Sequence, residues 1–510
     1  MNSFSLDNLQ SLTWFFPEIA ITVGVIAVII WDLISAGLNR IRGIVVITLA
    51  SLLTSGFLSL AYLMRQLAGL TPSMSLFGGL LAFDPFSHLF RMLFAFVAAI
   101  VIVFASPSSE TGAGTRKRRG AGEFFTLLLI ITLGLNLMVM SRNLLMIYLS
   151  LEVVSVISFV MAGFKIDNRK SAEGALKYVI FGGMASGIML YGMSWLFGIS
   201  QSLDIGEIGN QIAMATAQNG RVPLVILLGV VCMLGGLGYK ISAAPFHMWT
   251  PDVYEGAPTS ITAFLSVGPK AAGFAVLIRF FEEGVKATTH YDGRLTPWAM
   301  IAGLIAMATM TVGNFTALHQ SNIKRMLAFS SIAHAGYMLL GFCVFDQQGK
   351  QAIMFYLLTY ALMNLGAFLV VAAVAERNGG NEDIATYNGL GSRSPVLAIM
   401  MAIFLFSLTG LPPFAGFIGK FYIFASLLHV GGRWNWILAT VGVLNSVVSL
   451  FYYARVVRAM YLTKPDDKRA LTVRVSWGTT IVALAVPTLA LGIYWAPIYD
   501  FMTASLLIGR

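Results

Sequence analysis

Long apolar stretches recur along the whole chain, and polar residues gather in the segments between them. A helix needs about 20 mostly apolar residues to cross a bilayer, because each residue adds about 1.5 Å. An open-ended segment crosses lipid only as a helix, since its backbone groups must be satisfied internally. Fourteen stretches qualify, beginning near residues 15, 41, 83, 124, 143, 174, 222, 259, 297, 325, 351, 395, 434 and 475. The pattern predicts an all-α polytopic membrane protein with about 14 transmembrane helices.

Two of the predicted spans contain helix-breaking residues. Pro245 follows a glycine-rich run in the seventh span, and Pro412 and Pro413 interrupt the twelfth. Proline removes a backbone hydrogen bond and clashes with the preceding turn. Lipid tolerates such breaks where the freed groups line a cavity. Because the breaks lie five spans apart, the pattern favours two inverted five-helix repeats, as in transporters. Ordinary proline kinks are the alternative.

This reading divides the chain into four parts. They are three N-terminal helices with a basic loop (1–123), a first repeat of spans 4–8 (124–290), a second repeat of spans 9–13 (291–465) and a final helix (466–510). Loops after odd-numbered spans are richer in Lys and Arg, above all at 116–119. The positive-inside rule therefore predicts that these loops face the cytoplasm and that both termini face the opposite side.

Composition agrees with a membrane protein and argues against several other classes. Hydrophobic residues make up 57% of the 510 residues and charged residues 11%, against about 25% charged in soluble domains. The net charge of +10 is concentrated in loops, so we interpret it as a topology signal and not as a nucleic-acid surface. Two isolated cysteines give no iron–sulfur, zinc or haem motif. No nucleotide-binding loop or catalytic triad motif is found, which argues against a self-contained enzyme.

Ionisable residues nevertheless lie deep in several predicted spans, where a charge costs about 2.5–3.5 kcal/mol on insertion scales. Glu152 lies near the middle of the fifth span and Lys270 near the middle of the eighth. Lys240 precedes the first break, and Lys420 follows the second. A lysine withdrawn from water releases its proton more easily, and water at the breaks could connect such groups. The series predicts a proton pathway that needs no metal. Inert buried charges are the alternative.

Three more residues are candidates for this pathway. Lys177 follows Glu173 by four residues, which permits an ion pair on the helix surface, although a lysine near a span end can also snorkel. His247 and His334 could relay protons near neutral pH, but a single buried histidine is more often a packing residue. Two other groups are predicted to be interfacial, namely Asp84, His88 and Arg91 in one and Lys324 and Arg325 in the other.

Three segments resemble a known family. They are GLGYKISAAPFHMWTPDVYEGAPTSITAFLSVGPKAAGF (236–274), NFTALHQSNIKRMLAFSSIAHAGYMLLG (314–341) and SLTGLPPFAGFIGKFY (407–422). They resemble the antiporter-like subunits of respiratory complex I, which are similar to subunits of Mrp-type cation/proton antiporters. The resemblance covers about residues 80–460. Within the family, the chain most resembles subunit 2 of the photosynthetic NDH-type complex of cyanobacteria and plastids.

The resemblance implies a role for each buried group. Glu152 and Lys177 match the paired glutamate and lysine of a first half-channel. Lys240 and Lys420 match the lysines of the two broken helices, and Lys270 matches the central connecting lysine. The family also implies that quinone reduction elsewhere in the complex drives the proton movement.

The resemblance further implies partners and a location. The chain would be a translocase subunit of a ferredoxin or NAD(P)H:plastoquinone oxidoreductase in the thylakoid membrane, with both termini lumenal. Plastoquinone and iron–sulfur clusters would be bound by partner membrane and peripheral subunits. This chain would contact lipids and bind no cofactor, metal or nucleic acid. Two alternatives stay open, a subunit of an Mrp-type sodium/proton antiporter and a non-pumping membrane scaffold.

Overall fold

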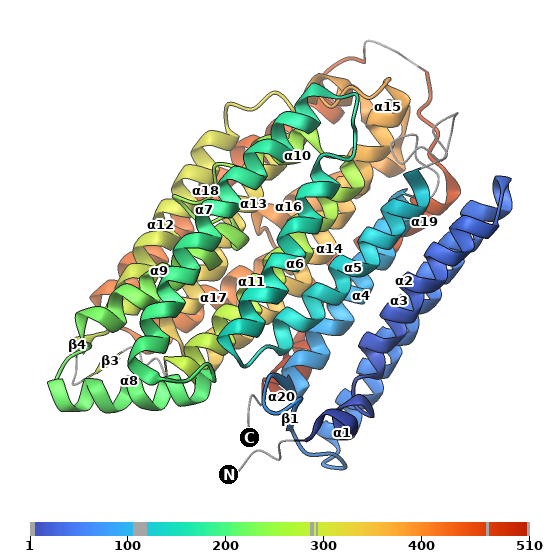
Figure 1. Cartoon of the computed structure of the whole chain (residues 1–510). Coiled ribbons are helices and arrows are strands. Elements are labelled where there is room, and N and C mark those ends of the chain that lie inside the picture. The colour runs from blue at the N-terminus through green and yellow to red at the C-terminus, as the bar shows by residue number, and fades with distance from the viewer. Residues whose placement is uncertain (1–5, 106–119, 286–289, 292–293, 466–468, 507–510) are drawn as a thin grey trace.

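The computed structural model of the chain describes residues 6–105, 120–285, 290–291, 294–465 and 469–506 (Figure 1). The basic residues at 116–119 lie outside the described residues. Within the described part, thirteen helices are long and apolar enough to cross a membrane. They are α2 (Phe16–Ile34), α3 (Gly37–Leu67), α4 (Pro85–Ala105), α5 (Ala121–Met140), α6 (Leu144–Ala162), α7 (Arg169–Ser200), α9 (Leu224–Ile241), α11 (Thr259–Arg279), α12 (Pro297–Ala317), α13 (Ile323–Val344), α14 (Gln347–Arg377), α18 (Arg433–Leu462) and α19 (Val475–Ile493).

Two shorter apolar helices, α16 (Pro395–Thr409) and α17 (Ala415–Val430), form the halves of a further span, the twelfth in chain order. The predicted number of fourteen spans and the break in the twelfth are therefore confirmed. The seventh span is broken as well, because α9 is followed by residues 242–249 and then by α10 (Thr250–Gly256). The largest error in a predicted start is five residues, at the sixth span, which begins at Arg169 and not near 174.

The remaining elements cap the two ends of the bundle. They are α1 (Asn8–Leu12), β1 (Met74–Leu76), β2 (Leu81–Phe83), α8 (Ile205–Asn219), the π-helical turn η3 (Phe280–Gly284), β3 (His290–Tyr291), β4 (Arg294–Leu295), the 3-10 turn η4 (Ile384–Tyr387), α15 (Leu390–Arg393) and α20 (Ala496–Ser505). The strands pair as two antiparallel hairpins, β1 with β2 and β3 with β4.

The short helices at the two ends of the bundle agree with the prediction that loops after odd-numbered and even-numbered spans lie on opposite sides of the membrane. In Figure 1, α1, α8 and α20 lie at one end of the bundle and α15 lies at the other. By chain order, α8 follows the sixth span and α20 the fourteenth, whereas α15 follows the eleventh. We call these the even-loop end and the odd-loop end. Which end faces the cytoplasm stays a prediction, as does the division of the chain at residues 123, 290 and 465.

Sequence analysis did not predict α8, although its signals are local. Asp204 precedes the helix and accepts a hydrogen bond from the Glu207 N–H at 3.0 Å, which is an N-cap. Gly220 ends the helix in the left-handed region at φ +64°. Ile205, Ile208 and other apolar residues form its buried face. Its mixed composition resembles a loop, because only one face of the helix is apolar.

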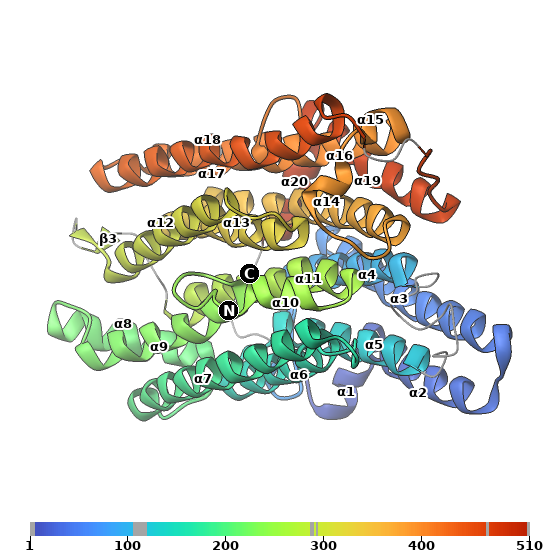
Figure 2. The same cartoon turned by 90° about the horizontal axis from the view of Figure 1, so that it is seen from above.

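The helix α11 is the centre of the bundle, and every residue in it is buried. It packs against α4, α9 and α14, and Figure 2 shows it between the α6–α9 side and the α12–α14 side. Small residues permit this close packing. A Cβ atom at Gly273 would lie 2.6 Å from the Ile241 side chain and 3.7 Å from that of Lys240. Because residue 273 is a glycine, α11 can pack closely against the end of α9 at the first break.

The helices α2 and α3 lie at the edge of the bundle (Figure 1), and a buried ion pair joins α2 to the rest. Glu18 of α2 contacts Arg91 of α4 at 2.9 Å, and neither side chain is exposed. Asn136 of α5 donates to Glu18 at 3.2 Å, and Arg91 contacts His88 Nδ1 at 3.0 Å. The residues of the predicted interfacial cluster, Asp84, His88 and Arg91, lie in the first turns of α4 or directly before it, and the structure buries all three side chains.

Candidate proton pathway

The first break holds Lys240 at the end of a helix. Lys240 lies in the last turn of α9, and Ser242 caps that turn with φ +64°, donating its N–H to the carbonyls of Gly238 and Tyr239. The last carbonyls of a helix carry partial negative charge, which stabilises a nearby cation. The Lys240 amine is buried and donates to Ser155 Oγ of α6 at 3.1 Å. The lysine is therefore fixed between the break and α6.

Glu152 lies on the same face of α6 as Ser155, three residues earlier. Its carboxylate accepts a hydrogen bond from the Ser186 hydroxyl of α7. It also interacts electrostatically with Lys240. The structure therefore couples Glu152 to the lysine of the first break.

Lys177 has different partners from those that the family resemblance implies. It pairs with Glu173 at 2.7 Å, as the four-residue spacing predicts, and with Asp252 of α10 at 2.6 Å. Among the described residues, no ion pair joins it to Glu152. The reason is geometric, since Ser186, which Glu152 contacts, lies nine residues from Lys177 along α7, or about 13 Å. The implied Glu152–Lys177 pair is therefore not formed.

Asp252 belongs to an ionic network around α10 that sequence analysis missed. Arg325 of α13 contacts Asp252 at 2.6 Å and Glu255 at 3.0 Å, and Lys170 of α7 contacts Glu255 at 2.7 Å. The network joins α7, α10 and α13. The side chain of Lys177 is 38% exposed and lies at the edge of this network.

Lys324 lies at the start of α13, as expected for an interfacial residue, but its side chain is buried within the protein. Its amine donates to the Ala257 carbonyl at 2.8 Å and pairs with Glu382 at 3.0 Å. Ala257 directly follows α10, so Lys324 binds a carbonyl that this short helix leaves free. Lys324 is a structural tie between α13, α10 and the segment before η4.

Lys270 lies midway along α11 and is 1% exposed. Its amine donates to Ser331 of α13 twice, to the hydroxyl at 2.5 Å and to the carbonyl at 3.1 Å. Tyr360 of α14 donates to the same Ser331 hydroxyl at 2.9 Å. The Lys270 amine also lies 5.9 Å from the centre of the Tyr254 ring, within reach of a cation–π contact. Lys270 is therefore joined to α13 and α14 by hydroxyl groups.

His334 continues this chain one turn further along α13. Its Nδ1 lies 2.6 Å from the Tyr356 hydroxyl of α14, and its Nε2 lies 3.3 Å from the Tyr453 hydroxyl of α18. Tyr453 in turn contacts the Ser330 hydroxyl. A neutral imidazole donates through one nitrogen and accepts through the other, so it can pass a proton between two hydroxyl groups. The geometry therefore fits the predicted relay at His334.

The second break holds Lys420 in a similar electrostatic setting. The Lys420 amine of α17 donates to the carbonyls of Leu408 and Thr409 at 3.2 and 2.9 Å, and to Ser446 Oγ at 3.0 Å. These carbonyls end α16. The amine also lies 4.2 Å from the centre of the Tyr337 ring. Both breaks thus place a lysine at the carbonyl end of their first half-helix.

The close approach of the two halves of the second break gives a prediction for stability. A Cβ atom at Gly416 would lie 1.9 Å from the Ser407 carbonyl oxygen. We expect Gly416→Ala to push α17 away from α16 and to lower the free energy of unfolding by about 1–3 kcal/mol, as other overpacked substitutions do. The displacement of α17 should also weaken proton transport through Lys420. Thermal unfolding of the purified complex measures the loss. Gly478→Ala on α19 is the control, because nothing lies within 4 Å of its Cβ position, and an equal loss in both variants would contradict the prediction.

His247 lies in the first break, between α9 and α10, and is half-buried. Its Nδ1 atom is buried and has no hydrogen-bond partner among the described residues. The structure places it close enough to Lys270 for an electrostatic interaction. It is thus near the pathway, but no direct contact with a predicted pathway residue supports the relay role.

The candidate pathway runs from α6 and α9 through α11 and α13 to α17, in the order in which these helices lie across the bundle in Figure 2. The structure brings Glu152 and Lys240 to one side, Lys270 to the centre, and His334 and Lys420 to the other. Sequence analysis missed the serines and tyrosines that join them, namely Ser155, Ser331, Tyr356, Tyr360, Tyr453 and Ser446. Hydroxyl residues are too common in apolar helices to be recognised individually.

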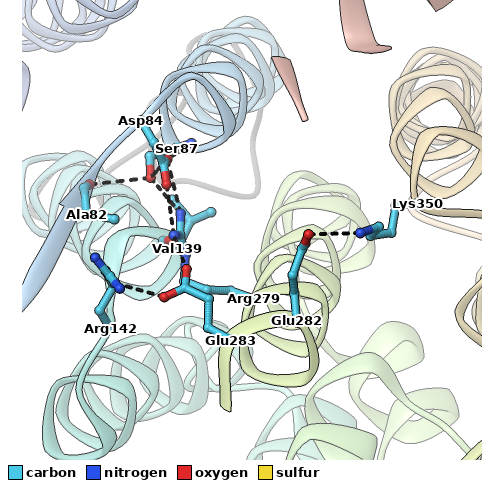
Figure 3. Close-up of polar contacts among 9 residues, drawn as sticks. All are labelled: Ala82, Asp84, Ser87, Val139, Arg142, Arg279, Glu282, Glu283 and Lys350. Atoms are coloured by element: carbon cyan, nitrogen blue, oxygen red, sulfur yellow. Dashed lines mark hydrogen bonds and ion pairs between the residues drawn. The ribbon is translucent and has the colours of Figure 1, made fainter. Parts of the chain in front are cut away.

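A second ionic network fixes the even-loop end of α11 (Figure 3). Arg279 contacts both carboxylate oxygens of Asp84, at 2.8 and 3.1 Å, and donates to the Val139 carbonyl of α5 at 3.0 Å. It also pairs with Glu283 of η3 at 3.2 Å, and Glu283 pairs with Arg142 at 2.9 Å. The network joins α4, α5 and α11, and it was not predicted.

The described residues contain no group of three or more His, Cys, Asp or Glu placed to hold a metal ion. The pathway itself consists of one carboxylate, three amines, an imidazole and several hydroxyl groups. These groups donate, accept and store protons. The arrangement suits proton transfer.

Comparisons with known proteins agree with this chemistry. A family described as NADH:quinone oxidoreductase/Mrp antiporter, TM, matches residues 141–449. NADH-quinone oxidoreductase subunit N 2 of Sorangium cellulosum is 58% identical over 510 residues, which covers 100% of both chains. A chain of respiratory complex I from Thermus thermophilus with bound aureothin has a TM-score of 0.77 and 28% identity, covering 96% of this chain and 99% of that chain. A chain of the Mrp complex from Dietzia has a TM-score of 0.82 at 20% identity, covering 98% and 97%. That likeness shows the fold alone, and with the Thermus structure it confirms the predicted all-α polytopic membrane fold.

Proposed function

This chain belongs to the family of NADH-quinone oxidoreductase subunit N, and from that premise we propose that it carries protons across the membrane as one subunit of a respiratory complex I. Other subunits of that complex would transfer electrons from NADH to a quinone. The observation that carries the proposal is the chain of contacts from Lys270 through Ser331 and Tyr360 to the neighbourhood of His334. A scaffold would not need this series of costly buried groups.

The proposed transfer begins at the first break. Glu152 and Lys240 share a proton-bearing site, in which the negative carboxylate favours the charged amine. A change in the protonation of Glu152 alters how firmly Lys240 holds its proton. Water at the break then carries the proton towards Lys270, which lies in the fully buried α11. The step moves a proton laterally and changes no covalent bond.

The second part of the transfer uses hydroxyl groups. Lys270 passes its proton to the Ser331 hydroxyl, which releases its own proton to the Tyr360 hydroxyl. Tyr360 in turn releases one proton towards His334, whose ring lies beside it in the direction of the second break. Lys420 receives the proton beside the free carbonyls of Leu408 and Thr409. Each hydroxyl accepts one proton and releases another, so none of them is consumed. Lys177 instead stabilises α10 through Asp252.

The electron donor and the quinone stay open to test. The name of the Sorangium relative specifies NADH and quinone, so we propose NADH as the donor. Ferredoxin or NADPH as donor, plastoquinone as acceptor and a thylakoid location remain predictions of the resemblance to the photosynthetic complex. In isolated membranes we expect NADH, and not reduced ferredoxin, to drive quinone reduction by the complex that contains this chain. If the complex accepted electrons from reduced ferredoxin and not from NADH, the chain would instead be assigned to the photosynthetic type of complex.

The proposed function itself is tested by isolating the tagged chain in mild detergent. We expect it to copurify with subunits that hold iron–sulfur clusters and the quinone site, and the reconstituted complex to take up protons when NADH reduces quinone. Isolation without redox subunits, together with sodium/proton exchange in liposomes, would favour the Mrp-type alternative. An assembled complex that pumps equally well without the lysines would favour the scaffold.

The cytoplasmic orientation of the odd-loop end is part of the proposal.

A further inference from the structure

A polar cavity lies at the odd-loop end of the bundle, apart from the first break. Its volume is about 260 Å³. It is bounded by the start of α11, the end of α14, the end of α4 and the start of α19. Neither α6 nor α9, which hold Glu152 and Lys240, contributes to its lining. The cavity therefore borders α11 at its start, where α4, α14 and α19 surround it.

Charged groups surround this cavity. Glu376 lines it and pairs with Arg474, and Glu382 lines it and pairs with Lys324 at 3.0 Å. Lys165 also lines the cavity. Apolar cavities stay dry, whereas a cavity of this size with several polar partners holds water. The lining therefore predicts a hydrated space.

Two buried oxygen atoms without partners lead from this space towards Lys270. Ser260 lines the cavity and is 3% exposed, and its hydroxyl has no hydrogen-bond partner among the residues that the structure describes. Asn364 of α14 is fully buried, and its Oδ1 likewise has no partner in the described part of the chain. Buried polar atoms are almost always hydrogen-bonded, to water where protein offers no partner. Both atoms thus mark positions for ordered water between α11 and α14.

The remaining distance is short enough for a few water molecules. Asn364 Nδ2 donates to Ser266 Oγ at 2.5 Å, and Ser266 lies one turn before Lys270 on α11. Ser260 lies six residues before Ser266, or about 9 Å along the helix axis. Roughly three waters at hydrogen-bond spacing cover that distance. On the other helix, Tyr360 lies one turn from Asn364 and already contacts the partner of Lys270.

We propose that this cavity is a water-filled intake through which Lys270 receives protons directly from the odd-loop side, without passing through Lys240. This proposal rests on the proposed function of the chain. Each water accepts one proton and releases another, so the net change is one proton moved from the cavity to the Lys270 amine. The α11–α14 path would thus be a second intake beside the first break.

Hydration and sidedness are tested by thiol labelling of the whole complex in sealed vesicles. Ala375→Cys lines the cavity, whereas Ala367→Cys lies on the same helix and is fully buried. A charged, membrane-impermeant thiosulfonate added from the odd-loop side should label Ala375→Cys about tenfold faster, because a buried thiol reacts only after local opening. The parent complex gives the background from Cys232, Cys343 and the cysteines of the other subunits. Equal rates in the two variants would show a dry cavity and overturn the proposal.

The path itself is tested by a pair of substitutions that differ in one hydroxyl group. Ser260→Val and Ser260→Thr have similar shapes, but only the threonine can hold water at this position. We expect Ser260→Val to slow proton uptake through this intake by about a hundredfold, as loss of one proton-transfer group does, and Ser260→Thr to keep it. Unchanged uptake in Ser260→Val, with uptake lost in Lys270→Met, would overturn the intake while the proposed function stands. Unchanged uptake in Lys270→Met as well would overturn the proposed function.

Discussion

Replacing Lys270 by methionine is expected to stop proton transfer through this chain while the complex still assembles. Methionine has a similar length and fits an apolar environment, but it carries no proton. The substitution also removes a charge that α11 buries completely, so we expect little loss of stability. Loss of a proton-transfer group in such a pathway lowers the rate by about a hundredfold or more. Proton uptake by the reconstituted complex, measured with a pH-sensitive dye during quinone reduction, reports the effect.

The matched control for this variant is Lys170→Met. Lys170 is a lysine that pairs with Glu255 at 2.7 Å, but its side chain is 67% exposed and lies in the network around α10. We expect this variant to pump as the parent complex does, because exposed ion pairs contribute little. An assembled Lys270→Met complex that pumps normally would remove Lys270 from the pathway, whatever the control shows.

Replacing Arg279 by alanine is expected to destabilise the chain more than any other single substitution considered. Asp84 would keep its buried charge and lose both contacts to the guanidinium group. Breaking a buried ion pair from one side costs about 3–5 kcal/mol, because the remaining charge has no partner. The Val139 carbonyl and Glu283 would lose a donor as well. We expect a lower unfolding temperature of the complex and less of this chain in the purified preparation.

A double substitution separates the pair from the rest of the network. Asp84→Asn combined with Arg279→Met removes both charges, so we expect it to recover part of the stability that Arg279→Ala loses. Additive losses in the double variant would mean that the two residues act independently, against the geometry in Figure 3. Proton transport by the double-variant complex that stays folded should be close to that of the parent complex, because the network lies at the end of α11 and not at Lys270.

Much of the fold could be predicted because a bilayer restricts which backbone structures can cross it and how long they must be. The length of the apolar stretches determined the fourteen spans, and prolines located both breaks. The buried lysines were recognisable because a charge in an apolar span is costly. These signals are strong and local, so one sequence was enough for Lys240, Lys270 and Lys420 to be identified as candidates.

The partners of the charged residues could not be predicted in the same way. Asp84 and Arg279 are 195 residues apart in the chain, and no local pattern relates them. Glu18 and Arg91 likewise meet only after α2 has packed against α4. The same limit explains Lys177, whose pairing with Asp252 depends on where the break places α10. Helix packing determines which charges meet, and a hydropathy pattern does not contain that information.

The complete burial of α11 has a consequence for biosynthesis. This helix enters the membrane before α13 exists, because Ser331, the partner of Lys270, lies 61 residues further along the chain. Until then, Lys270 has neither of its Ser331 acceptors, and α11 lacks the covering by α14. A chain that ends after α11 would therefore hold an amine in lipid at a cost of several kcal/mol. The amine of Lys270 therefore gains its hydrogen-bond acceptors only when the second half of the chain has been made.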